Sequence, residues 1–134
     1  MLGISYAQAA ESLRFDAPLA YSSKEKIKSF TVNELSSPLE KFDLAGTDLN
    51  GDGLHEFIVR AKMCERAPLC DYFILGEAKN TMINLGKIEA AYILLGNDYA
   101  HGVRNLLVFD NQENDFDFQL YTWDPEQSLY REAQ

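Results

Sequence analysis

The sequence is short of positive charge and of long apolar runs. Its 134 residues hold 12 Lys and Arg against 21 Asp and Glu, a formal net charge of −9. This excess of negative charge disfavours binding to nucleic acids and to anionic membrane surfaces. No apolar run approaches the roughly 18 residues of a membrane-spanning helix. We therefore expect no nucleic-acid partner and no membrane span, and we expect a protein partner, which the charge favours as basic.

Local motifs of the common catalytic chemistries are missing as well. There is no Gly-x-Ser-x-Gly, no His-Glu-x-x-His and no glycine-rich phosphate loop. The two histidines, His55 and His101, have no recognisable nucleophile beside them in the sequence. A pair of carboxylates from distant positions stays open, because such a pair leaves no local signature. We expect a protein that is not an enzyme.

What is present is the composition of one globular domain, with 46% hydrophobic and 25% charged residues. From Leu39 onward, short apolar runs alternate with turn residues, which predicts a mainly β fold. We expect an antiparallel meander, sandwich-like or partial-propeller-like. Residues 24–35 fit either a short N-terminal helix or a surface strand. The predicted strands are Phe42–Gly46, Glu56–Met63, Tyr72–Gly76, Met82–Ile88, Tyr92–Leu95, Arg104–Asp110, Phe116–Trp123 and Ser128–Arg131.

The N-terminal residues bear on the cellular location. Ala7-Gln8-Ala9 has the small-x-small form that signal peptidase cleaves. A basic segment before it is missing and the apolar stretch is short, so a truncated leader and a chance match both stay open. On the first interpretation, residues 1–9 are the remnant of a signal peptide and residues 10–134 are a single β-rich domain.

The only two cysteines, Cys64 and Cys70, lie close together on either side of Pro68. This spacing predicts a disulfide that closes a short loop, worth roughly 2 to 2.5 kcal/mol by chain entropy. Zinc and redox pairs favour a two-residue spacing, and two free buried thiols are the other alternative. A disulfide and a leader together favour a periplasmic or secreted protein.

The most informative segment is Asp48-Leu49-Asn50-Gly51-Asp52-Gly53-Leu54-His55-Glu56. Its oxygen-bearing side chains alternate, and Gly53 permits a sharp turn after the third of them. Hard oxygen donors at this spacing favour calcium as the cofactor. The alternative is an empty turn held by its own Asx hydrogen bonds. The expected calcium ligands are Asp48, Asn50, Asp52, the carbonyl of Leu54, and Glu56.

The pattern D-x-N-x-D-G-x-x-E, followed by Phe57-Ile58-Val59, resembles the calcium loops of FG-GAP and VCBS repeats. It differs from an EF-hand, because Val59 stands where the bidentate Glu belongs. A wider pattern over residues 44–130 resembles small secreted bacterial proteins of unknown function. That pattern comprises the loop, the cysteine pair, Gly102 before an apolar strand, and Tyr121, Trp123 and Tyr130. The resemblance implies a structural calcium ion in a strand–loop–strand unit and implies no particular activity.

A second acidic segment, residues 110–117, lacks the alternating spacing, so we expect a solvated hairpin loop that could meet a basic partner. The aromatic residues of the last predicted hairpin either pack in the core or anchor a partner or a sugar. The candidate partner-binding residues are Asp110, Glu113, Asp115, Asp117, Tyr121 and Trp123.

We expect a non-catalytic exported binding protein, with an inhibitor or immunity-type partner of a cell-wall hydrolase or toxin as the leading hypothesis. The alternative is an envelope module that binds a glycan or another ligand, which a groove of aromatic and polar side chains would favour. A small carboxylate-dependent hydrolase is the least favoured hypothesis. It requires a pocket with at least two titratable groups of shifted pKa.

Overall fold

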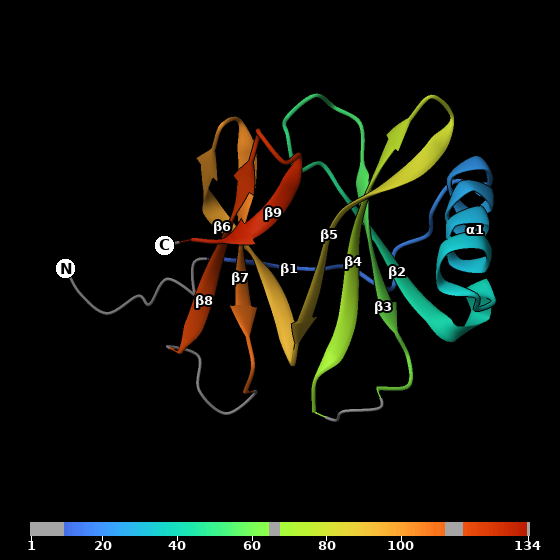
Figure 1. The fold of residues 1–134 in the computed structure, drawn as a ribbon, viewed down its shortest axis with the longest axis horizontal. Coiled ribbons are helices and arrows are strands. Elements are labelled where there is room, and N and C mark those ends of the chain that lie inside the picture. Colours follow the sequence, from blue (N-terminus) through green and yellow to red (C-terminus); the bar gives the residue numbers. More distant parts are fainter. Residues whose placement is uncertain (1–9, 65–67, 112–116, 134) are drawn as a thin grey trace.

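In the computed structural model, two antiparallel β-sheets stack face to face and one helix covers the outer side of the four-stranded sheet (Figure 1). The structure describes residues 10–64, 68–111 and 117–133. The four-stranded sheet has the order β2-β3-β4-β5, with β2 Phe42–Thr47, β3 Glu56–Ala61, β4 Cys70–Ala78 and β5 Thr81–Ala90. The five-stranded sheet has the order β1-β6-β7-β8-β9, with β1 Glu11–Ser12, β6 Tyr92–Ala100, β7 Val103–Phe109, β8 Phe118–Asp124 and β9 Leu129–Glu132.

The middle residues of the central strands β3 and β4 are apolar because both faces of these strands are covered. In β3, Ile58 packs against the other sheet, whereas Phe57 and Val59 pack beneath the helix. In β4, Ile74 and Leu75 divide between the two clusters in the same way. Successive side chains of a strand point to opposite faces. A strand that is covered on both faces therefore has apolar residues in succession instead of alternating apolar and polar ones.

The helix α1, Tyr21–Leu35, decides between the two alternatives for residues 24–35. Its buried residues Ile27, Phe30 and Thr31 recur three to four positions apart, which matches one helical face. The helix ends at Ser36, whose left-handed φ of 53° lets its N–H and that of Ser37 bond to the Thr31 carbonyl. A short 3₁₀ turn, Leu39–Lys41, leads into β2.

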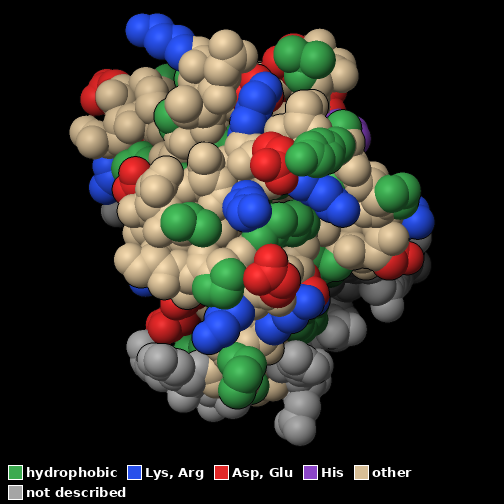
Figure 2. Space-filling model, turned by 90° about the vertical axis from the view of Figure 1, so that its right-hand side faces the viewer, with side chains coloured by type: hydrophobic (Ala, Val, Ile, Leu, Met, Phe, Trp, Pro, Cys, Tyr) green, Lys and Arg blue, Asp and Glu red, His purple; other side chains and the backbone are tan. Residues whose placement is uncertain are grey.

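The outer surface on the helix side carries charges of both signs among scattered apolar side chains (Figure 2). Lys26 of α1 forms an ion pair with Glu77 of β4 at 2.5 Å, one of the links between the two layers. Among the residues that the structure describes, no helix has the length and apolarity needed to cross a bilayer.

The predicted mainly β, antiparallel meander is confirmed, and the eight predicted strands correspond to β2–β9. The largest difference is in β6, which continues to Ala100 instead of ending at Leu95, since its pairing with β7 resumes at Tyr99 and Ala100 after an irregularity. The polar residues Asn97 and Asp98 hid this continuation in the sequence. The short strand β1 was not predicted; it pairs with β6 through Glu11 and Ser12. Phe116, the predicted start of β8, lies outside the described residues.

Two features of β5 set how the sheets meet. The pairing of β4 with β5 shifts at Leu85, which bulges out of register, and Gly86 follows it with a φ of 155°. At the other end of β5, the chain passes to the opposite sheet through the single residue Ala91. The N–H of Ala91 donates to the Phe109 carbonyl at 2.7 Å, which anchors this corner to β7.

Candidate functional site

The predicted calcium loop lies between β2 and β3, as expected, and its backbone is folded by its own acidic side chains. The Asp48 carboxylate accepts the N–H groups of Gly51 and Gly53, each at 2.8 Å. Asp52 accepts the N–H of Leu54 at 2.9 Å. Gly51 and Gly53 adopt φ angles of 75° and 86°, which other residues adopt only under strain. These hydrogen bonds form Asx turns, as expected for the alternative in which the loop is held by its own side chains and binds no metal.

The loop is tied to both sheets through Leu49. The Leu49 side chain is buried in the core between the sheets. Its N–H donates to the Glu56 carboxylate at 2.7 Å, and its carbonyl accepts the N–H of Arg104 in β7, also at 2.7 Å. The loop is therefore a fixed wall and not a free connection.

The pKa values of Asp48 and Glu56 in the loop shift in opposite directions. The hydrogen bond from the Gly53 N–H is the main cause that lowers the pKa of Asp48 below its ordinary value. The pKa of Glu56 is raised, first because burial disfavours its charged form and further because Asp52 and Asp48 repel it. A cation bound among these groups would relieve that repulsion.

The donor set fits calcium by its chemistry, since it combines carboxylates with an amide oxygen and a backbone carbonyl. Among the described residues, no three Asp, Glu, His or Cys side chains form a group arranged to hold a metal. The present hydrogen bonds explain this, because the Asp48 and Asp52 oxygens turn toward backbone N–H groups. Calcium binding would need these side chains to reorient.

The loop forms one wall of a groove of about 1010 Å³. The opposite wall is the β4–β5 hairpin, whose turn residues Lys79 and Asn80 have φ angles of 52° and 66°. That pair of positive φ angles is typical of the tight turns in two-residue hairpins. Aromatic residues of β8 and β9 also line the groove. Its lining includes Leu49, Asn50, Asp52, Leu54, Glu56, Ile83, Leu85, Trp123 and Tyr130.

Trp123 and Tyr130 form the aromatic part of this lining. Their rings meet edge to face, with centroids 5.6 Å apart. The hydroxyl of Tyr130 donates to the Arg104 carbonyl at 2.7 Å. Burial raises the pKa of Tyr130 far above its ordinary value, so this hydroxyl stays protonated. The hydrogen bond to Arg104 fixes Tyr130, and both rings line the groove.

The structure separates Asp110 and Asp117 from Trp123. Asp110 and Asp117 are exposed and flank the ends of β7 and β8 where Phe109 pairs with Phe118. Trp123 lies toward the opposite end of β8, about 17 Å farther along at the usual rise of a strand. Tyr121 lies half-buried against the core between the sheets. Glu113 and Asp115 lie outside the described residues.

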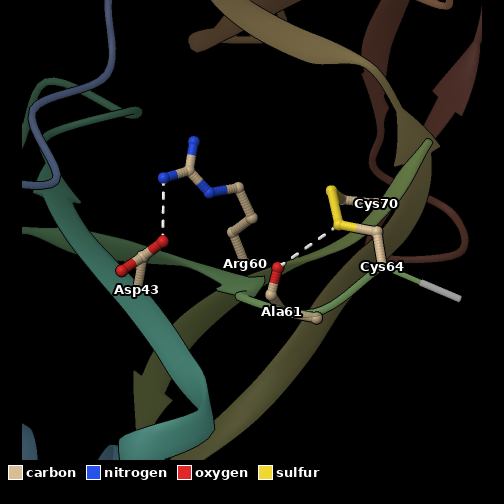
Figure 3. The surroundings of a disulfide bond; sticks show 5 residues. All are labelled: Asp43, Arg60, Ala61, Cys64 and Cys70. Carbon is tan, nitrogen blue, oxygen red and sulfur yellow. Dashed lines mark hydrogen bonds and ion pairs between the residues drawn. A yellow bond between two sulfur atoms is a disulfide. The ribbon is translucent and has the colours of Figure 1, made fainter. Parts of the chain in front are cut away.

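The predicted disulfide joins Cys64 to Cys70, with the Cα atoms 4.9 Å apart (Figure 3). It links the segment after β3 to the start of β4, at the end of the sheet away from the groove. Near it, Arg60 and Asp43 form an ion pair at 2.9 Å across β2 and β3 (Figure 3). The disulfide therefore reinforces the sheet and takes no part in the groove.

Sequence reasoning missed the wall that faces the loop. Ile83 and Leu85 were predicted within a strand, but nothing local indicated that they face residues 48–56. Lys79-Asn80 between two apolar runs was the available signal for a tight turn. Comparison with protein-family models, with curated proteins and with solved structures finds no match to this chain.

Proposed function

We propose that this chain is a non-catalytic exported binding protein whose partner occupies the groove beside residues 48–56. The observation that carries the proposal is the convergence of the loop, the β4–β5 hairpin and Trp123 on one groove. Loops at one end of a rigid sandwich are a common position for binding residues. A concave site with an aromatic side chain and a few polar groups is typical of recognition.

The non-catalytic part of the proposal is supported by the structural roles of two groups in the groove. Glu56 and Tyr130 both have raised pKa values, the pattern that the hydrolase hypothesis requires. Yet the Glu56 carboxylate accepts the Leu49 N–H, and the Tyr130 hydroxyl donates to the Arg104 carbonyl. Both bonds stabilise the wall and the floor of the groove, which accounts for these groups without a reaction.

For the loop we propose a structural calcium ion, held by Asp48, Asn50, Asp52, Glu56 and the Leu54 carbonyl. The repulsion of Glu56 by Asp48 and Asp52 supports it, because a divalent cation offsets that repulsion. The ion would stiffen one wall of the groove.

The partner that we propose is a basic cell-wall hydrolase or toxin, which this chain would inhibit. The net charge of −9 supports a basic partner, and the disulfide supports a place outside the cytoplasm. The test is calorimetric titration of the chain, at low and at high salt, with purified basic hydrolases of the lysozyme type, with their activity followed in parallel. Salt-sensitive binding that lowers hydrolase activity supports the proposal, and the absence of binding at low salt contradicts it.

A second candidate is a glycan-binding module. Trp123 lines the groove together with the amide side chains of Asn50 and Asn80, which is the convergence of aromatic and polar groups that this hypothesis requires. A glycan array that includes cell-wall fragments separates the two candidates. Glycan binding that quenches Trp123 fluorescence would favour the module over the inhibitor.

A further inference from the structure

We propose that the partner of this groove is a protruding loop of a basic protein, with an aliphatic or aromatic tip and Lys or Arg on its flanks. This inference rests on the proposed binding function and specifies its surface and the chemistry of its partner. The surface, which we call the loop end, consists of residues 48–56, 79–80, 101–102 and 124–128. In Figure 1 these four connections lie at the same end of the two sheets.

Exposed apolar side chains gather at the loop end. Seven large hydrophobic residues are exposed among those that the structure describes. Two of them, Leu54 and Ile83, line the groove, and Tyr99 and Leu129 lie near the ends of β6 and β9 at the loop end without lining it. Leu54 is 69% exposed and Ile83 is 44% exposed, and both line the groove. Clustered exposed apolar groups on a soluble surface mark an interaction site, whereas single ones do not.

The interior of the groove is suited to an apolar tip. Leu49, Leu85 and Val103 line it and belong to the core between the sheets. Aliphatic walls such as Leu54 and Ile83 gain little from sugar hydroxyls but gain dispersion and burial from a hydrophobic side chain. These walls favour a protein over a glycan.

The charge around the groove indicates which charged residues should flank the apolar tip of the partner loop. Arg131 forms an ion pair with Asp124 at 3.0 Å and offsets the charge of that carboxylate. The remaining carboxylates of the loop end are Asp48, Asp52, Glu56 and Glu126, against the single lysine Lys79. A divalent cation in the 48–56 loop would reduce this negative excess without reversing it. Complementarity therefore calls for positive charge beside the apolar tip, with calcium or without it.

The test uses three synthetic peptides, each cyclised by a disulfide, and the full chain labelled with ¹⁵N. The first peptide has a Leu-Trp tip flanked by lysines, the second has the same tip flanked by glutamates, and the third has a Ser-Ser tip flanked by lysines. We expect the first to bind about tenfold more tightly than either of the others, with amide shifts at the loop end. Equal binding of all three, or shifts centred elsewhere, would overturn the proposal.

Matched variants locate the site. Leu54→Asp and Ile83→Asp add a charge to the loop end and should each weaken binding of the first peptide by about tenfold. The controls are Val32→Asp on α1, 48% exposed, and Met63→Asp beside the disulfide, 88% exposed. These controls should leave binding unchanged. All four positions are exposed, so circular dichroism is expected to show the same fold, and equal losses in variants and controls would contradict the site.

The same variants separate this inference from the proposed function. A hydrolase that binds the wild-type chain and the Leu54→Asp chain equally would leave the binding function standing and refute the loop end as its surface. Peptide binding at the loop end without any hydrolase binding would support the surface and refute the proposed class of partner.

Discussion

Gly86 of β5 lies directly against Tyr130 of β9, at the point where the two sheets come together beneath the groove. A Cβ atom on Gly86 would stand 3.3 Å from the Tyr130 Cβ and 3.6 Å from its backbone nitrogen. The φ of 155° at Gly86 also belongs to a region that other residues rarely adopt. Glycine thus sets the close approach of β5 to β9.

The first prediction concerns this contact. Gly86→Ala should lower the free energy of unfolding by about 2 to 3 kcal/mol, because the added methyl group meets the β9 backbone and the φ is unfavourable. The measurement is urea denaturation followed by Trp123 fluorescence. Gly102→Ala is the matched control, since its φ is 78° and its Cβ would meet nothing within 4 Å. Equal losses in both variants would show that the contact with Tyr130 is unimportant.

The second prediction concerns calcium. At a calcium concentration a hundred times the dissociation constant, the free energy of unfolding should rise by about 2.7 kcal/mol relative to chelator. The measurement is the melting temperature in calcium, in magnesium and in chelator. Glu56→Gln should abolish the calcium effect, because it removes one charged ligand and retains an acceptor for the Leu49 N–H.

Asp117→Asn is the control for the calcium experiment, since Asp117 is exposed in the other acidic segment, away from the groove. Its calcium response should equal that of the wild-type chain. A wild-type chain whose melting temperature is the same in saturating calcium and in chelator would refute the calcium site.

The third prediction is a pH dependence with two opposite signs. Asp48 has a lowered pKa in the folded state, so its stabilisation is present above about pH 4 and is lost as the pH falls through the folded-state value. Glu56 has a pKa raised above 4.5, so its ionisation destabilises the fold as the pH rises through that raised value. In chelator, Glu56→Gln should remove the second trend and keep the first. Urea denaturation between about pH 3 and about pH 8 measures both trends, and identical pH profiles for the two chains would contradict the assignment to Glu56.

The fourth prediction concerns the disulfide. The double variant Cys64→Ala, Cys70→Ala should lose about 2 kcal/mol of stability, because the unfolded chain is freed from a short closed loop. Urea denaturation of the variant and of the reduced wild-type chain should give similar midpoints. Peptide binding at the loop end should persist in both, since the disulfide lies away from the groove. A loss of peptide binding would contradict this prediction and would show that the disulfide affects the groove at the other end of the sheet.

Strand positions could be predicted because buried strands appear in the sequence as short apolar or alternating runs between turn residues. Phe57-Ile58-Val59 is apolar throughout and became a strand covered on both faces. The helix could not be distinguished from a strand, because only Ile27, Phe30 and Thr31 of its 15 residues are buried and most of the other residues are polar. Strand β1 was missed because two residues are too few to show a period.

The candidate site was predictable only in its local part. The alternating Asp and Asn residues with glycines at 51 and 53 predicted the turn, since those residues favour Asx turns and positive φ. The groove depends on how two sheets stack, which brings Ile83 and Trp123 to one mouth from distant positions. That stacking depends on contacts between residues far apart in the sequence, so no local sequence pattern predicts it. Asp110 and Asp117 show the reverse case, because they belong to a conspicuous local pattern but lie far from the groove.

The one-residue corner at Ala91 has a consequence for biosynthesis. The four-stranded sheet is built from neighbouring hairpins, so the pairing of residues 42–90 needs no strand of the five-stranded sheet and can form while those strands are still being synthesised. The strand β1 is the exception, since Glu11 and Ser12 must wait for β6 to be synthesised. This two-residue strand can therefore pair only after β6 exists, and its pairing connects residues 11–12 to the later half of the sequence.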